Sequence, residues 1–333
     1  MKQISIIIPA YNEEASIGRL LDSIEKISYP KEMYEVIVVS DGSTDGTARV
    51  VQQYPNVRLV NLTQNVGRYE CRKAGAKNAR YEHLLFVDAH STVDPEILSA
   101  LNQIDAKVVT GHVLDAGPQG PFETFYWAIR RLIFSKFLKA LNRPHYLTSE
   151  NFDSMPKGTT VFYVEKELLF STYDDLATVT MGKDASDDTK LLRAVVAREP
   201  IVIHPNVKIS YFSRSTTRAR VKHLYERGPK FVDYYFNPSL RNFWMVIAFP
   251  LLLLAAAVYG LFFWQGPLIF KLAGLVGLDL GITLLLSRSV REFFTIAWVM
   301  PVCVVVFYAG IVWGIVIKLL AWLGLGGRKN QPG

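Results

Sequence analysis

The stretch ISIIIPAYNEE at residues 4–14 decides the fold. Its first part, Ile4 to Ile8, is apolar and rich in β-branched side chains, which is typical of a parallel strand buried on both faces. Pro9 ends this strand, and the polar residues from Asn12 onward open a helix. Apolar residues then recur at helical spacing, at positions 17, 20, 21 and 24. A strand followed directly by a helix is the building unit of an α/β fold.

The same alternation continues along the next part of the chain. The sequence predicts strands at 34–39, 57–61 and 83–87, and helices at 44–54 and 67–79. Such short intervals indicate a mostly parallel sheet. Ligands bind at the carboxyl ends of the strands in such sheets. Polar clusters stand at three of these ends, namely Pro9 to Glu13, Asp41 to Ser43 and Asp88 to His90. We therefore expect a binding site at this edge.

Composition divides the 333 residues into two parts. Residues 1–240 have a globular composition, whereas the chain from Asn242 onward has that of a membrane protein. The net charge of +7 suits a nucleotide diphosphate or an anionic membrane surface, and the apolar C-terminal part favours these over nucleic acid. The two cysteines, Cys71 and Cys303, fall in different parts, which fits a reducing compartment without disulfides. Because the N-terminus is not typical of a signal peptide, we expect a cytoplasmic N-terminal domain.

Three apolar runs cover residues 243–264, 268–286 and 294–323. About 20 apolar residues suffice to cross a membrane. The middle run contains Lys271 and Asp279, and charges at mid-bilayer are costly, so the sequence predicts two or three spans. Arginines before the first run and between the second and third place residues 1–240 on the cytoplasmic side. The alternative is a buried core of apolar helices in a soluble protein.

Several segments in order resemble glycosyltransferase family 2. They are IPAYNEE at 8–14, VSDGSTDGT at 39–47, NVG at 65–67 and FVDAH at 86–90, followed by SDDTKLLR at 186–193, which resembles the acidic acceptor-side motif. The resemblance covers about residues 3–230. It implies a GT-A fold, a Rossmann-like and mostly parallel sheet domain in residues 1–230. The apolar runs place a juxtamembrane segment and two or three transmembrane helices in residues 231–333. The resemblance also implies a nucleotide-diphospho-sugar donor, a divalent metal and inversion at the anomeric carbon.

The nucleotide-binding residues are carried over from this resemblance. They are Pro9, Ala10, Tyr11, Glu13, Asp41, Asn65, Gly67, Arg72 and Asp88. A carboxylate such as Asp41 at a strand end can accept a hydrogen bond from a nucleobase N–H, and glycines permit tight turns and close backbone approach. The alternative for the segment from Asp41 to Ser43 is an ordinary turn in which Asp41 is a local cap.

The segment Asp88-Ala89-His90 departs from the family pattern Asp-x-Asp. The resemblance implies that Asp88 and His90 hold the metal, which would neutralise charge developing on the leaving group. An imidazole ligand shifts the expectation from Mg²⁺ to Mn²⁺. Alternatively, His90 only forms hydrogen bonds near the site, and Asp88 alone contacts the ribose or the metal.

Asp188 matches the position of the general base in the family, with Asp187 on the acceptor side. An inverting transfer to a hydroxyl needs a carboxylate that takes the hydroxyl proton. Both acids also precede a helical pattern, where the helix dipole favours them without any catalytic role. If the acceptor is a phosphate, no base is needed and Asp188 only positions a group.

Two basic segments suggest contact with anionic ligands or with a membrane. In residues 214–230, Arg218, Lys222 and Arg227 are expected to contact the acceptor or the diphosphate, or else anionic lipid. Residues 122–141 predict a basic amphipathic helix, which either docks on a membrane surface or packs in the core. The chain lacks the Gln-x-x-Arg-Trp motif of processive synthases, which argues against a long polymerase.

These observations predict a multi-pass membrane glycosyltransferase. It would move a sugar, expected to be UDP-linked, to a lipid-linked or glycan acceptor at the cytoplasmic membrane face in envelope or exopolysaccharide synthesis. One alternative is transfer to polyprenyl phosphate itself. Another is a non-catalytic membrane scaffold with a GT-A fold, for which His90 in place of an aspartate is the only support.

Overall fold

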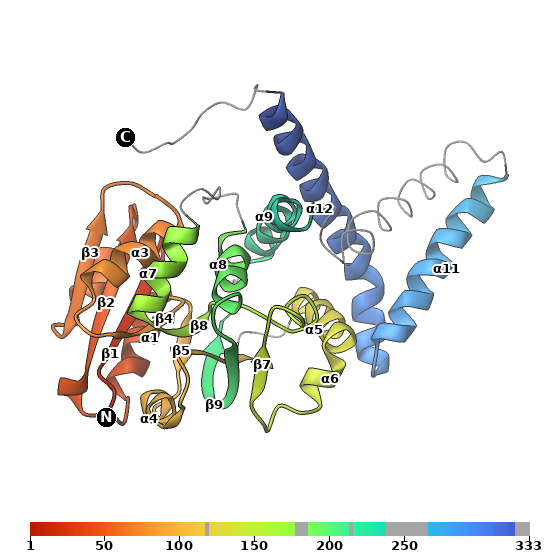
Figure 1. The fold of residues 1–333 in the computed structure, drawn as a ribbon. Coiled ribbons are helices and arrows are strands. Elements are labelled where there is room, and N and C mark those ends of the chain that lie inside the picture. Colours follow the sequence, from red (N-terminus) through yellow and green to blue (C-terminus); the bar gives the residue numbers. More distant parts are fainter. Residues whose placement is uncertain (117–119, 177–185, 213–215, 237–265, 324–333) are drawn as a thin grey trace. The chain divides into compact units, whose positions relative to one another are not determined.

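The computed structural model describes residues 1–116, 120–176, 186–212, 216–236 and 266–323 (Figure 1). The chain forms two compact units. Unit 1 comprises residues 1–118, 136–183 and 187–213, and unit 2 comprises residues 119–135, 184–186 and 214–333. Each unit is described separately below.

Unit 1 is built on a nine-stranded sheet with the order β3-β2-β1-β4-β8-β6-β9-β5, to which β7 adds by pairing with β9. The first four strands in this order are parallel, as predicted from their apolar runs. They are β1 (Ile4–Ala10), β2 (Tyr34–Asp41), β3 (Val57–Leu62) and β4 (His83–Val87). Ile4 pairs with Tyr34 on one side and with His83 on the other, so the carboxyl ends of these strands meet at one edge.

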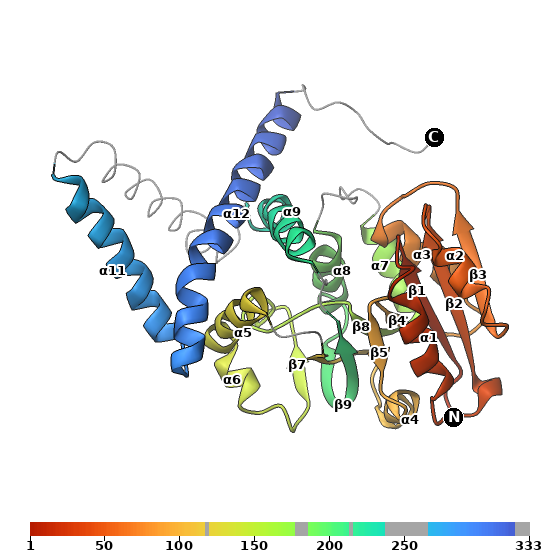
Figure 2. The same ribbon diagram turned by 180° about the vertical axis from the view of Figure 1, so that it is seen from behind.

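Helices cover both faces of this parallel part (Figures 1 and 2). Ile6 and Ile8 of β1 share a core with Leu20 of α1 (Ile17–Glu25) and Val51 of α2 (Thr47–Val51). The helix α3 (Arg68–Asn78) packs on β1 and β2. Burial on both faces explains why β1 reads as a continuous apolar run rather than as an alternating one.

The second half of the sheet is mixed, which the sequence reading did not anticipate. Strand β8 (Val161–Glu165) runs antiparallel to both β4 and β6 (Val108–Asp115), whereas β6 and β9 (Ile201–Tyr211) are parallel. Neighbouring parallel strands are joined by crossover connections that usually contain a helix. The second half of the sheet lacks the regular strand–helix–strand repeats of the first half, so its strands can run in either direction. The remaining elements of unit 1 are η1 (Lys31–Met33), β5 (Ser91–Val93), α4 (Ile97–Gln103), α6 (Ser135–Leu138), β7 (His145–Leu147), α7 (Lys166–Asp175) and α8 (Asp187–Val196).

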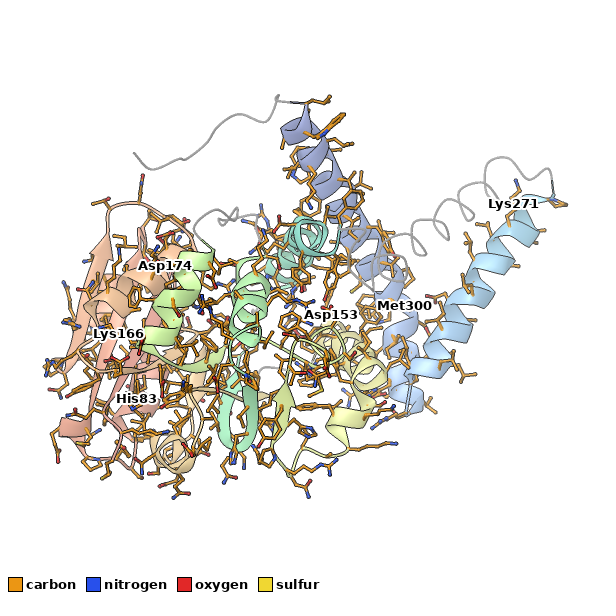
Figure 3. All side chains as sticks on the ribbon, viewed as in Figure 1. His83, Asp153, Lys166, Asp174, Lys271 and Met300 are labelled. Carbon is orange, nitrogen blue, oxygen red and sulfur yellow. The ribbon has the colours of Figure 1, made fainter. Side chains whose placement is uncertain are left out.

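Unit 2 is helical. Its described helices are α5 (Pro121–Ile133), α9 (Thr217–Tyr235), α11 (Leu268–Leu286) and α12 (Val290–Trp322). The backbones of α9 and α12 approach closely, because a Cβ on Gly228 would lie 2.2 Å from the carbonyl carbon of Gly310. On α5, Ala128 packs with Leu286, Ile296 and Met300, the last of which is labelled on α12 in Figure 3.

The segment predicted as a basic amphipathic helix, residues 122–141, contains two helices in the structure. The helix α5 ends at Ile133, and a separate short helix, α6, follows after Phe134. Phe134 has φ −108° and ψ 27°, which ends the helical backbone. The apolar side of α5 is divided, since Ala128 is buried against α11 and α12 while Leu132 and Ile133 are exposed. Core packing therefore accounts for part of the amphipathic pattern.

Helix α12 is long and apolar enough to cross a membrane, and it is the one helix in the described part of the chain that passes this test. Trp298, Val305 and Trp313 are exposed on it. The helix α11 matches the second predicted apolar run, whereas the first run, residues 243–264, lies outside the described residues.

Candidate active site

Asp41 ends β2 and connects it to the start of α3. Its carboxylate oxygens accept hydrogen bonds from the backbone N–H groups of Val66 at 2.7 Å and Gly67 at 3.0 Å. Gly42 has φ +63°, and a Cβ there would lie 2.5 Å from the backbone of Gln64. Asp41 thus anchors the loop that leads into α3. A carboxylate has about four acceptor positions, so these two bonds do not by themselves exclude a nucleobase.

The turn after β1 is fastened to the turn after β2. Asn12, at φ +55°, accepts a hydrogen bond from the backbone N–H of Thr44 through its side-chain oxygen at 2.8 Å. The backbone N–H of Glu13 donates to the Thr47 hydroxyl at 2.8 Å. Pro9 and Ala10 lie at the end of β1, and Tyr11 is exposed. These bonds hold the predicted nucleoside-binding turn in a fixed shape.

Asn65 carries a buried acceptor in the same loop. Its side-chain oxygen is buried and has no hydrogen-bond partner in the described part of the chain. A buried acceptor without a donor is costly, at roughly 1–3 kcal/mol. Asn65 directly precedes Val66 and Gly67, whose N–H groups donate to Asp41, so this unmet acceptor belongs to the loop that the Asp41 carboxylate anchors.

Asp88 follows β4 and is largely buried. Its Oδ1 lies 3.5 Å from Nη2 of Arg72, and its backbone oxygen accepts a hydrogen bond from the Ser91 hydroxyl at 2.6 Å. Two positions further on, Nδ1 of His90 lies 3.5 Å from Oε1 of Glu13. Within the described residues, no three His, Cys, Asp or Glu side chains converge as a metal cage. Any cation at Asp88 and His90 would need ligands from a bound substrate or from water.

Arg72 is the centre of a charge cluster. Its side chain is 2 % exposed, and Nη1 donates to Oδ1 of Asp188 while Nη2 donates to the Thr159 hydroxyl at 2.7 Å. Because Nη2 also faces Asp88, one guanidinium joins the end of β4 to the start of α8. Arg68, one turn earlier on α3, lies 3.0 Å from Oδ2 of Asp188 and is 40 % exposed. One arginine is therefore fixed and the other is open to solvent.

The cluster holds Asp188 as a carboxylate. Burial by itself raises the pKa of Asp188, but the charges of Arg72 and Arg68 outweigh it and hold this pKa well below its usual range. Burial likewise lowers the pKa of Arg72, and Asp188 and Asp88 more than restore it. A base with so low a pKa takes up protons poorly. Asp188 becomes a better base only when one of the arginines leaves it.

Asp187 and Asp188 start α8, as the pattern predicted, but they differ in role. Asp187 is buried and accepts a hydrogen bond from the backbone N–H of Asp188 through Oδ1 at 3.0 Å. An acidic side chain in the first turn of a helix is also stabilised by the helix dipole. Asp188 alone of the two forms ion pairs with the arginines.

The basic residues predicted on the acceptor side lie on α9, in unit 2. Lys222 lies 3.8 Å from Glu226, and the guanidinium of Arg227 lies 5.7 Å from the ring centre of Tyr126. No ion pair of Arg218 occurs within the described residues. The roles of these three residues remain predictions.

Sequence reasoning missed Arg68 and Thr159. A signal for Arg68 was available, because Arg68 and Arg72 stand four residues apart at the start of a helix and so share one face. Thr159 lies in a loop before β8 and had no recognisable pattern.

Residues 5–157 match the family model described as glycosyl transferase family 2. This segment is a family 2 domain. The match includes Asp41, Arg72 and Asp88 but ends before Asp188.

Curated proteins match this chain over part of their length. The chain is 37% identical over 102 residues to the poly(ribitol-phosphate) beta-N-acetylglucosaminyltransferase TarS of Staphylococcus aureus, covering 29% of this chain and 18% of TarS. It is 31% identical over 135 residues to a dolichyl-phosphate beta-glucosyltransferase of Dictyostelium discoideum, covering 34% of this chain and 41% of that protein. The chain therefore matches less than half the length of these relatives.

Solved structures confirm the GT-A fold class. The mannosyltransferase PcManGT of Pyrobaculum calidifontis, in complex with GDP-Man and Mn²⁺, superposes with a TM-score of 0.58 at 18% identity, covering 92% of this chain and 87% of that one. Residues 1–349 of S. aureus TarS in complex with UDP-GlcNAc give a TM-score of 0.51 at 17% identity, covering 97% and 92% of the two chains. At these identities the likeness concerns the fold.

Proposed function

We propose that the protein is a glycosyltransferase whose catalytic domain lies within residues 1–230. The observation that carries this proposal is the cluster of Asp88, Arg72 and Asp188 at the carboxyl edge of the parallel strands, inside and next to a family 2 domain. The donor is a nucleotide-diphospho-sugar, proposed to be UDP-linked because TarS, a relative, was solved with UDP-GlcNAc. Asp41 and the buried oxygen of Asn65 would accept hydrogen bonds from the nucleoside.

The residues at the end of β4 fit a divalent cation. Asp88 is largely buried, and its one side-chain partner among the described residues is Arg72 at the long distance of 3.5 Å. Asp88 and His90 together offer a carboxylate and an imidazole, a set that suits Mn²⁺ better than Mg²⁺. Such a cation would neutralise charge on the diphosphate leaving group. The alternative role of His90, a hydrogen bond or ion pair with Glu13, matches their separation of 3.5 Å.

In transfer to a hydroxyl, the acceptor oxygen forms a bond to the anomeric carbon as the bond from that carbon to the diphosphate breaks. Asp188 takes the hydroxyl proton, and the nucleotide diphosphate leaves with the electron pair. Arg68 is the exposed partner of Asp188, so the diphosphate can draw it away as it binds. Loss of that cation raises the basicity of Asp188 at the time when the donor is in place.

A second candidate function is transfer to a polyprenyl phosphate. It is favoured by the two arginines on Asp188, because a carboxylate with so low a pKa is a weak base and a phosphate acceptor arrives already ionised. The dolichyl-phosphate beta-glucosyltransferase among the relatives supports this class of acceptor. In both cases we propose that α12 anchors the protein in a membrane, with the catalytic domain on the cytoplasmic side and a role in envelope polysaccharide synthesis.

The test is a panel of nucleotide sugars offered to the full chain in detergent, with and without Mn²⁺ and after chelation. We expect turnover with a UDP-sugar that falls on chelation and returns with Mn²⁺. Asp188→Asn separates the two acceptors: a fall of about 10²- to 10⁴-fold with donor binding retained indicates a hydroxyl acceptor. Turnover within a fewfold of the wild type indicates a phosphate acceptor. No turnover with any donor would favour the non-catalytic scaffold.

A further inference from the structure

Two arginines of unit 2 surround one tyrosine. The guanidinium carbon of Arg130, on α5, lies 5.8 Å from the ring centre of Tyr126, one turn earlier on the same helix. The guanidinium carbon of Arg227, on α9, lies 5.7 Å from the same ring centre. Arg130 also lies 4.8 Å from the ring centre of Trp127. Two helices far apart in sequence thus bring two positive charges to one phenol.

These two charges are not neutralised within the described part of the chain. Two neighbouring arginines of unit 2 have carboxylate partners: Arg220 lies 2.8 Å from Glu123, and Arg131 lies 2.8 Å from Glu292. No described carboxylate lies within the same reach of Arg130 or Arg227. In addition, Nε of Arg130 is buried and has no hydrogen-bond partner among the described residues. An anion held between the two guanidinium groups would balance their charge.

The electrostatics of Tyr126 agree with an excess of positive charge. Burial by itself raises the pKa of the Tyr126 phenol. The charges of Arg227 and Arg130 outweigh burial, so the pKa of Tyr126 lies below its ordinary value. A site that stabilises a phenolate will also stabilise another oxyanion held near the same two guanidinium groups.

The surroundings favour an anion that carries an apolar chain. A cavity of about 400 Å³ in unit 2 is lined by Trp127, which contacts Arg130, and by Arg131 and Arg291 among others. Leu132 and Ile133, which follow on α5, are 62% and 60% exposed. The adjacent α12 begins at Val290 and is long and apolar enough to span a membrane. Arg291 stands at the start of α12, and arginine and tryptophan side chains near the end of a membrane-spanning helix are typical of the lipid headgroup level.

We propose that Tyr126, Arg130 and Arg227 form a binding site for the phosphate group of a lipid. Each guanidinium donates to the phosphate oxygens in a charge-assisted hydrogen bond, and the lipid chain lies along the exposed apolar residues of unit 2. The phosphate belongs either to a membrane phospholipid or to a lipid-linked acceptor, because both present anionic phosphate oxygens attached to an apolar chain. The proposal rests on the membrane placement of α12 in the proposed function, but not on sugar transfer.

Lipid binding to the full chain, purified in detergent, can be measured by native mass spectrometry without any sugar donor. The probes are farnesyl phosphate, phosphatidylglycerol, dioleoylglycerol and inorganic phosphate. We expect one tightly bound lipid phosphate and weak binding of the other two probes. Arg130→Gln and Arg227→Gln should each weaken it about tenfold, the effect of one charged hydrogen bond, and the double variant should abolish it. Arg227→Lys should keep part of the affinity.

Arg288→Gln is the matched control, because Arg288 is an exposed arginine of unit 2 whose loss lowers the net charge equally. Unchanged binding in this variant would exclude general attraction to a basic surface. A preference for farnesyl phosphate would identify the acceptor as the source, and equal binding of phosphatidylglycerol would identify bulk lipid. The proposal fails if dioleoylglycerol or inorganic phosphate binds as tightly as the lipid phosphates, or if the two Gln variants behave like the control. Because no donor is present, the result is independent of turnover.

Discussion

The arginines of unit 1 and unit 2 differ in how their charge is balanced. In unit 1, Arg72 is buried between Asp88 and Asp188, and Arg68 shares Asp188 with it, so two cations face two carboxylates. In unit 2, Arg130 and Arg227 face a phenol and no described carboxylate. The charges of the unit 1 cluster balance without a ligand. In the proposal above, a bound lipid phosphate balances the charges of the unit 2 cluster. Both lie at places where an anionic substrate or lipid is expected.

The difference predicts how each cluster responds to the loss of a charge. Removing a cation from a balanced buried cluster leaves a carboxylate unpaired in a low dielectric, which is costly. Removing a cation from an unbalanced cluster relieves repulsion and costs little stability. Ligand binding should respond differently from stability. Loss of Arg130 or Arg227 should weaken lipid binding in unit 2 although it changes the free energy of unfolding little.

The largest expected effect on stability is that of Arg72→Met. This change leaves Asp88 and Asp188 without their shared partner and should lower the free energy of unfolding by about 3–5 kcal/mol. Arg68→Met is the control, because its pair with Asp188 is exposed and should contribute about 1 kcal/mol or less. Urea denaturation of the full chain measures both. Equal losses in the two variants would mean that burial does not decide the contribution of an arginine here.

A second comparison can be made inside unit 2. Arg220→Met should lower the free energy of unfolding by about 3 kcal/mol, because Glu123 is buried and loses the cation 2.8 Å away. Arg227→Met, on the same helix, should change it by roughly 0.5 kcal/mol or less. The same denaturation experiment applies, and a strong loss in Arg227→Met would show that its charge is compensated after all.

The sequence was informative where local pattern determines structure. The parallel strands at 4–10, 34–41 and 83–87 and the polar residues at their ends followed from apolar runs and the turn residues after them. The antiparallel direction of β8 could not be predicted in this way, because it depends on long connections between strands. The ion pairs of Asp188 with Arg68 and Arg72 were also beyond reach, since they join positions 120 and 116 residues apart. The helix break at Phe134 was missed because an apolar, basic pattern continues across it.

A third group of charges, in unit 1, joins two cations to the carboxylate of Asp153. Its charge balance should make the free energy of unfolding depend on pH. Asp153 lies 2.7 Å from Arg193 and 3.8 Å from Lys157. Burial lowers the pKa of Lys157 to about 8; Asp153 opposes this shift and Arg193 adds to it. In the unfolded chain Lys157 keeps its proton up to about pH 10.5. Above pH 8 the unfolded state therefore binds more protons than the folded state, and stability should rise with pH.

Between pH 7 and pH 9 this rise amounts to about 1 kcal/mol. Lys157→Met should remove it, while Lys31→Met, at an exposed lysine, should leave the pH dependence as in the wild type. The difference between the pH profiles of the two variants gives the contribution of Lys157 alone. Other groups, including Cys71, contribute equally to both profiles; the raised pKa of Cys71 makes stability fall as pH rises. Parallel profiles for both variants would show that one carboxylate is enough for the two cations. The charge balance of this group would then resemble that of Arg72 rather than that of Arg130 and Arg227.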